Sequence, residues 1–376
     1  MALSISSALL LLLNMAGALL SPRAPPGPPA TAADAGAGDD DVDFFFFPFL
    51  ILYKSGRVER LMGTDTVPAA TDPATGVASR DVVIDAATGL AARLYLPSSA
   101  IANTTTSSSS SAKLPLVVFF HGGAFVTESA SSPTYQRYLN ALASKAGALV
   151  VSVDYRLAPE HPVPAGHDDA WAALAWTLRS ARRAGGGPDS DPWLARHADP
   201  ARLFLVGDSA GGNLAHNVAM RAGREGLDAT VRGIALLDPY FWGKRPVPSE
   251  TTDAAARRWR ERTWAFVCAG AYGVDDPVIN PVAMAPAEWR RMGSTRVLVT
   301  VAGLDTLSAR GRAYVHALRT SGWKGEVELY ETPGEYHVYF LTKPDSEEAV
   351  EEMEAVAGFI RGERVRLSAP SSRMDA

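Results

Sequence analysis

Gly207-Asp208-Ser209-Ala210-Gly211 lies between an apolar run, residues 202–206, and a run of helix-forming composition, residues 212–221. The pattern Gly-x-Ser-x-Gly recurs by chance, so an ordinary serine in a glycine-rich loop remains an alternative for the pentapeptide alone. A strand, a tight turn and a helix in this order hold a serine on a strained corner, with its hydroxyl exposed above a sheet. Glycines at the two ends suit such a corner, because a Cβ would clash where strand and helix nearly touch. We therefore predict that Ser209 is a nucleophile.

The chain beyond residue 114 alternates apolar strands with helices. The expected strands are 116–120, 148–153, 202–206, 234–237, 296–301 and 326–330. The expected helices are 133–147, 168–184, 212–221, about 308–321, and a last one capped by Asp345 or Ser346. Such alternation is typical of an α/β fold with a mainly parallel central sheet flanked by helices.

Two hairpins and one long insertion complete the expected domain, residues 43–362. The hairpins turn at Ser55-Gly56 and at Thr88-Gly89, and a Ser/Thr tract at 104–111 is expected to be a solvent loop. The phenylalanine-rich run at 44–50 must fold against something, because it is too apolar for a free tail. The segment between strands 234–237 and 296–301 is long and rich in aromatic residues. We expect cap segments over the active edge of the sheet at about 43–75 and 240–292.

The termini and the composition limit the function classes. Residues 1–42 are expected to be a disordered extension, with a signal segment at 1–18 as the alternative, and 363–376 a C-terminal tail. Cytoplasmic location is expected, or the secretory pathway if that signal acts; the apolar core at 8–13 is too short for a stable membrane anchor. The net charge of -5 suggests no nucleic-acid partner. The single cysteine, Cys268, excludes an internal disulfide and a cysteine-based metal site, and we expect it to be buried.

Three histidines follow Ser209, and a serine nucleophile needs one of them as a base. His216 lies within the helix that follows Ser209, and His316 lies inside a later helix. His337 lies in a loop directly after the last strand, so it is free to reach the serine. In this fold the acid and the histidine follow the serine in chain order. We therefore predict that His337 is the base.

An acid must orient this base, and two aspartates follow strands. Asp305 lies closer along the chain to His337, and we predict it as the acid, with Asp238 as the alternative. The other role open to Asp305 is that of a helix N-cap.

Backbone N–H groups must stabilise the oxyanion that forms during acyl transfer. His121-Gly122-Gly123-Ala124-Phe125 directly follows a strand, where such a loop belongs. We predict an oxyanion hole made by Gly122, Gly123 and Ala210. His121 is expected to brace the loop rather than to do chemistry.

Together these motifs resemble the hormone-sensitive-lipase branch of the α/β-hydrolases. The resemblance rests on residues 121–125, 154–162 (Asp-Tyr-Arg-Leu-Ala-Pro-Glu-His-Pro) and 207–213, and on Asp305 with His337. Residues 54–60 and Asp238-Pro239-Tyr240-Phe241-Trp242-Gly243 resemble plant carboxylesterases more specifically. Ala124 departs from the family, since many relatives have a third glycine there.

The resemblance implies a serine carboxylesterase that hydrolyses short-chain carboxylic esters through an acyl-enzyme, without a cofactor or a metal, with part of the cap built from the N-terminal segment. The partner is then a small-molecule ester. The family also contains gibberellin receptors, which have an aliphatic residue in place of the catalytic histidine. A hormone-binding protein and an acyltransferase using the same triad are therefore the alternatives.

Overall fold

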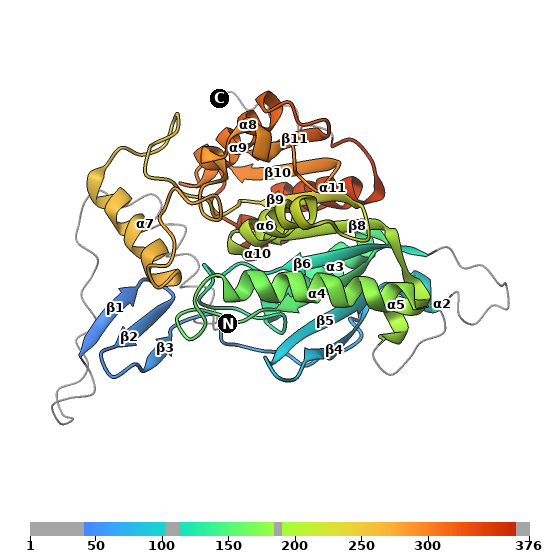
Figure 1. Cartoon of the computed structure of the whole chain (residues 1–376). Coiled ribbons are helices and arrows are strands. Elements are labelled where there is room, and N and C mark those ends of the chain that lie inside the picture. Colours follow the sequence, from blue (N-terminus) through green and yellow to red (C-terminus); the bar gives the residue numbers. More distant parts are fainter. Residues whose placement is uncertain (1–40, 103–112, 184–189, 366–376) are drawn as a thin grey trace, which may run out of the picture.

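A sheet of eight strands forms the centre of the molecule (Figure 1). The computed structural model describes residues 41–102, 113–183 and 190–365. The strands of this sheet are β4 (Ala78–Asp85), β5 (Leu90–Leu96), β6 (Leu114–Phe120), β7 (Leu149–Asp154), β8 (Ala198–Asp208), β9 (Val231–Leu237), β10 (Arg296–Ala302) and β11 (Glu326–Thr332). Their order is β11-β10-β9-β8-β6-β7-β5-β4. All neighbours are parallel except β4 with β5 and β5 with β7, so the predicted α/β class with a mainly parallel sheet is confirmed.

Helices cover both faces of this sheet (Figure 1). The longer ones are α3 (Pro133–Ala146), α4 (Ala165–Arg182), α6 (Ala210–Glu225), α9 (Ser308–Thr320) and α11 (Glu347–Arg361), and the short ones are α2 (Ser98–Ala102), α5 (Pro192–His197) and α10 (Tyr339–Thr342). Apolar side chains of α4, α6 and α9 form one core with the sheet, and those of α3 and α11 form another on the opposite face. The five residues of the run 116–120 are therefore fully buried, as a strand covered on both sides requires.

A small antiparallel sheet lies beside α7 (Ala254–Val267) at one end of the molecule (Figure 1). It contains β1 (Val42–Phe46), β2 (Leu50–Tyr53) and β3 (Val58–Arg60). The ring of Phe44 stacks on that of Phe266 in α7, with 4.5 Å between centroids. Arg60 donates from Nε to the carbonyl of Val126 at 2.7 Å, and its guanidinium pairs with Glu160. The phenylalanine-rich run is thus covered, as its apolar character requires, and the element that covers it is α7. Arg60 connects β3 to the loop after β6.

The rest of the long insertion packs differently. It contains the 3-10 turn η1 (Pro281–Ala283) and the short helix α8 (Pro286–Trp289). Trp289 is buried and meets Tyr314 of α9 edge to face, with 4.9 Å between centroids. This end of the insertion therefore lies against the body of the molecule rather than beside α7.

The hairpins, the single cysteine and the start of α11 were all expected from the sequence. Both hairpins form, Cys268 is fully buried, and burial raises the pKa of its thiol to about 12. Ser346 caps α11 by accepting from the N–H of Ala349 at 3.2 Å, whereas Asp345 pairs with Arg137. The Ser/Thr tract at 104–111, residues 1–40 and residues 366–376 lie outside the described residues. Among the helices that are described, none has the length and apolarity of a membrane span.

Candidate active site

Ser209 stands at the sharp corner between β8 and α6, with φ 50° and ψ −115°. Its N–H donates to the carbonyl of Leu237 at 2.8 Å. A Cβ on Gly207 would lie 2.3 Å from the carbonyl oxygen of Gly211, and one on Gly211 would lie 1.9 Å from that of Phe120. Both positions therefore require glycine, and the strand, turn and helix expected from the sequence are present.

Two further predicted residues meet the serine. His337 places Nε2 2.9 Å from Ser209 Oγ and Nδ1 2.7 Å from Asp305 Oδ2. Asp305 follows β10, and its Oδ1 also accepts from the N–H of Leu307 at 2.9 Å. When Nδ1 carries its proton toward Asp305, Nε2 presents a lone pair to the hydroxyl of Ser209. In this tautomer, His337 can accept a proton from the hydroxyl of Ser209.

The other two histidines after Ser209 lie elsewhere. His216 is buried in α6 with Nδ1 3.0 Å from the hydroxyl of Tyr314, and burial lowers its pKa to about 3. His316 is exposed on α9. Neither forms a hydrogen bond with Ser209.

Carboxylates surround His337 and govern its charge. Burial opposes protonation of its imidazole, but the charges of Asp305, Asp238 and Asp208 outweigh burial and raise its pKa to about 9. Asp238, the alternative acid, lies close by. A carboxylate oxygen of Asp238, a carboxylate oxygen of Asp305 and a ring nitrogen of His337 all lie within 4.8 Å of one another. The hydrogen bond to the imidazole belongs to Asp305.

The loop after β6 differs from expectation at Gly122. Its N–H donates to the hydroxyl of Tyr135 in α3 at 2.7 Å, and that hydroxyl donates to Asp208 Oδ2 at 2.9 Å. An N–H that donates to a buried hydroxyl does not point at a substrate, so the predicted oxyanion role of Gly122 is at odds with this geometry. Gly122 is needed for close approach instead, because a Cβ there would lie 2.4 Å from Asp208 Oδ2.

Three other N–H groups near Ser209 donate no hydrogen bond within the described part of the chain: those of Gly123, Ala124 and Ala210. Gly123 has φ 98° and Ala124 has φ 53°, so two successive residues take left-handed backbone. The sequence analysis named Gly123 and Ala210 but not Ala124. An alanine carries no signal that its backbone will be left-handed.

His121 braces this loop, as expected. Its ring stacks on that of Tyr155 with 4.3 Å between centroids, and the Tyr155 hydroxyl donates to the His121 carbonyl at 2.7 Å. Burial lowers the pKa of the His121 imidazole. The neighbouring Arg156 pairs with Asp169 of α4 at 2.7 Å. Within the motif at 154–162, Tyr155 thus holds the loop after β6, and Arg156 connects the motif to α4.

Comparison with known proteins places this geometry in a family. The α/β hydrolase fold family matches residues 117–341. The chain belongs to the α/β-hydrolases. The sequence prediction of this family is confirmed.

Relatives of this α/β-hydrolase include plant enzymes. The Arabidopsis thaliana protein "Probable carboxylesterase 13" is 44% identical over 328 residues, which cover 85% of this chain and 98% of that protein. The 2-hydroxyisoflavanone dehydratase of Glycyrrhiza echinata is 43% identical over 317 residues, covering 83% of this chain and 94% of that enzyme. An esterase of Pyrobaculum calidifontis superimposes with a TM-score of 0.59 at 27% identity, covering 76% of this chain and 84% of that one. The resemblance to plant carboxylesterases is thereby confirmed.

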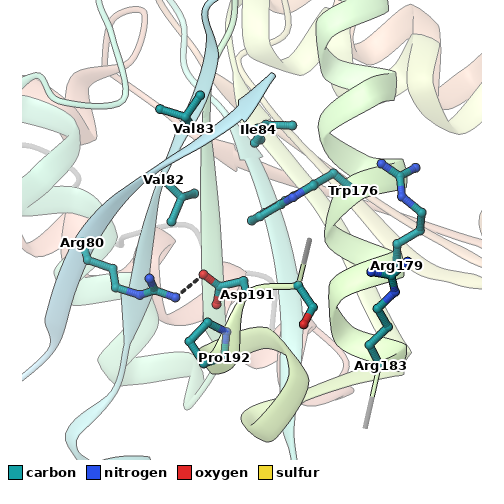
Figure 2. Close-up of a pocket in the computed structure, with 10 residues that line it drawn as sticks. Arg80, Val82, Val83, Ile84, Trp176, Arg179, Arg183, Asp191 and Pro192 are labelled. Carbon is teal, nitrogen blue, oxygen red and sulfur yellow. Dashed lines mark hydrogen bonds and ion pairs between the residues drawn. The ribbon is translucent and has the colours of Figure 1, made fainter. Parts of the chain in front are cut away.

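A separate hollow of about 660 Å³ lies between β4 and the C-terminal half of α4 in this α/β-hydrolase (Figure 2). An ion pair between Arg80 and Asp191 crosses one side of it. Trp176 and three β4 residues supply apolar walls. It shares no residue with the groups around Ser209.

Proposed function

We propose that the protein is a serine carboxylesterase that hydrolyses short-chain carboxylic esters through an acyl-enzyme on Ser209. The observation that carries this proposal is the hydrogen-bonded series from Ser209 Oγ through His337 to Asp305, at 2.9 Å and 2.7 Å. Its broader class is carboxylic ester hydrolase, in keeping with the relatives named as carboxylesterase and esterase.

In the proposed acylation, His337 Nε2 takes the proton of Ser209 as Oγ attacks the ester carbonyl. Asp305 holds the Nδ1–H tautomer and stabilises the imidazolium that forms. His337 then gives the proton to the leaving alcohol. Water attacks the acyl-enzyme in the second half, with His337 acting again as base and then as acid to release Ser209.

The N–H groups of Gly123, Ala124 and Ala210 are the proposed donors to the oxyanion. They replace the set expected from the sequence, because the N–H of Gly122 is engaged by Tyr135. Each such donor lowers the barrier by about 3 kcal/mol in enzymes of this type.

The proposed cap consists of β1–β3 with α7. Its aromatic side chains reach the turn that carries Ser209: Trp264 of α7 stacks on Tyr240 with 4.5 Å between centroids, and the N–H of Tyr240 donates to the Ser209 carbonyl at 2.8 Å. A continuous series of contacts therefore joins α7 of the cap to Ser209, which supports a role for the cap in selecting the ester.

The proposal is tested by p-nitrophenol release from p-nitrophenyl acetate and p-nitrophenyl butyrate. We expect turnover by the intact protein and its loss in Ser209→Ala and His337→Ala. Intact, folded protein without turnover would contradict a general esterase and favour a hormone-binding protein, which gibberellin binding then checks. Addition of an alcohol distinguishes an acyltransferase, because a transferase gives the new ester faster than the free acid.

The cytoplasm is the proposed location, with the secretory pathway as the alternative. A fluorescent protein fused to the C-terminus reports on this directly. Diffuse cytoplasmic signal agrees with the proposal, and signal in the endoplasmic reticulum that depends on residues 1–18 contradicts it.

A further inference from the structure

Asp238 is a buried carboxylate beside the triad that the proposed mechanism does not use. It follows β9, is 1% exposed, and has φ 43° although it is not a glycine. Its own N–H donates to the carbonyl of Thr300 in β10 at 3.0 Å. A buried carboxylate on left-handed backbone is costly, so surrounding contacts must hold it.

Both carboxylate oxygens of Asp238 accept a backbone hydrogen bond. Oδ1 accepts from the N–H of Ala302 at 2.8 Å, and Oδ2 accepts from the N–H of Val338 at 2.7 Å. Ala302 ends β10, and Val338 directly follows His337. One side chain therefore ties the end of β10 to the loop that carries the base.

The bond to Val338 acts at a strained point. Val338 has φ 48°, which a β-branched residue rarely adopts. The left-handed turn there lets the chain pass from His337 into α10. The carboxylate of Asp238 accepts from the N–H of Val338 in this conformation, so the turn would lose this hydrogen bond if the carboxylate were removed. The side chain of Asp238 thus helps to fix where the imidazole points.

The charge of Asp238 also acts on His337. Facing Asp238 are Asp305 from the loop after β10, His337 itself and Glu352 from α11, while Asp208 at the end of β8 also acts on His337. Burial and then the charge of Asp305 raise the pKa of Asp238 well above its usual value. When ionised, Asp238 in turn raises the pKa of His337.

We propose that Asp238 is a positioning residue for His337: its hydrogen bonds from the N–H groups of Ala302 and Val338 fix the left-handed turn that presents the imidazole to Ser209. This inference rests on the proposed function, in which His337 is the base. Asp305 keeps the direct hydrogen bond, and Asp238 acts through the backbone and through space.

Two variants test the inference, both uncharged. Asp238→Asn keeps the side-chain volume, and Asp238→Ser reduces it. If one of the two variants does not fold, the other serves for the test. Asp191→Asn is the matched control, because Asp191 is also a buried carboxylate that accepts from two backbone N–H groups, but it is not among the groups that raise the pKa of His337. Far-UV circular dichroism selects the folded proteins.

The first readout is the pH dependence of kcat/KM. Over the pH range in which Asp238 is ionised, loss of its negative charge makes the imidazolium less stable, so the pKa of His337 falls and the acid limb of the profile moves to lower pH. We also expect kcat to fall about 10- to 100-fold, because the imidazole is less well placed. Asp191→Asn should keep the acid limb and the kcat of the intact protein. An unchanged acid limb with unchanged kcat in the folded variants would overturn the inference.

The second readout is an NMR titration of the His337 imidazole, assigned by its disappearance in His337→Gln. It does not depend on turnover, so it separates the two proposals. Inactivity of the intact protein on esters would overturn the proposed function, whereas the titration still decides the inference. A lower His337 pKa or a displaced amide resonance of Val338 in the Asp238 variants supports it, and an imidazole pKa and a Val338 amide that both equal those of the intact protein refute it.

Discussion

At the residue scale, the hydroxyl of Tyr135 decides which N–H groups of the loop after β6 remain free. It accepts from Gly122 and donates to Asp208, and both partners are buried. Asp208 depends on this bond, because burial already raises the pKa of its carboxyl to about 7. The hydroxyl therefore holds the loop in the shape in which the N–H groups of Gly123 and Ala124 have no hydrogen-bond acceptor among the described residues.

Tyr135→Phe should lower both activity and stability. The N–H of Gly122 and the carboxylate of Asp208 would lose a buried partner, which costs about 1–3 kcal/mol of unfolding free energy. Urea denaturation measures this loss, and kcat/KM with p-nitrophenyl acetate should fall because the loop is no longer held. Tyr138→Phe in the same helix is the control, since no hydrogen bond of its hydroxyl is seen among the described residues. Equal effects of the two substitutions would refute the role of Tyr135.

The pH dependence of activity should follow His337. Only the neutral imidazole accepts the serine proton, and its pKa is raised to about 9, so kcat/KM should rise with pH through neutrality, reach half its maximum near pH 9 and level off above it. Initial rates from pH 5 to about 10 measure this, with Ser209→Ala as the baseline for spontaneous hydrolysis. A plateau already reached at pH 6 would show that the carboxylates do not control the imidazole.

The sequence predicted the residues that meet at Ser209 but not every donor around it. Chain order and loop position were enough to place His337 and Asp305, because both follow strands that end at the same edge of the sheet. Gly122 was different. The direction of its N–H depends on Tyr135, and no pattern in the sequence predicts that these two residues form a hydrogen bond.

At the scale of the element, the turn between β8 and α6 depends on close backbone contact. A methyl group at Gly211 would lie 1.9 Å from the carbonyl oxygen of Phe120. Gly211→Ala should therefore push α6 away from β6, lower the unfolding free energy by about 1–3 kcal/mol and abolish activity. Urea denaturation and ester turnover check both effects. Gly273→Ala is the control, because a methyl group at that position would have open space within 4 Å; comparable losses in both variants would contradict the argument.

Strands and long helices were largely predictable, because continuous apolar runs and helical spacing are local signals. The boundaries were less so. α4 begins at Ala165 rather than at 168. A short helix such as α5 (Pro192–His197) has too few residues for a period to be recognised.

At the scale of the whole molecule, a buried ion network connects α7 to the body. Glu250 is enclosed between Arg257 of α7 and Arg310 of α9, with contacts of 3.0 Å and 2.8 Å. All three side chains are almost fully buried. The network fixes the position of α7, and with it β1–β3, relative to the sheet.

Removal of Glu250, the acid that Arg257 and Arg310 share, should strongly destabilise the fold. Glu250→Ala leaves two buried guanidinium groups without their carboxylate, and we expect the unfolding free energy to fall by about 3–5 kcal/mol. Glu225→Ala, which breaks an exposed pair with Arg221, should cost less than about 1 kcal/mol. Chemical denaturation of both variants compares them. A small loss in Glu250→Ala would mean that water enters and replaces the acid.

Long-range packing was the least predictable level. The aromatic content of residues 44–50 and of α7 indicated two surfaces that need cover, and the resemblance implied that the N-terminal segment contributes to a cap. Nothing in either stretch identified Phe266 as the ring on which Phe44 stacks, because contacts between distant segments leave no local period in the sequence.

The central claim is an acyl-enzyme on Ser209, and reaction with a fluorophosphonate tests it most directly. This reagent gives a stable adduct on an activated serine, which peptide mass spectrometry locates. We predict one adduct per chain on Ser209, formed in step with the loss of esterase activity and far more slowly in His337→Ala. Turnover that persists when Ser209 is fully modified, or inactivation with the adduct on another residue, would contradict the account.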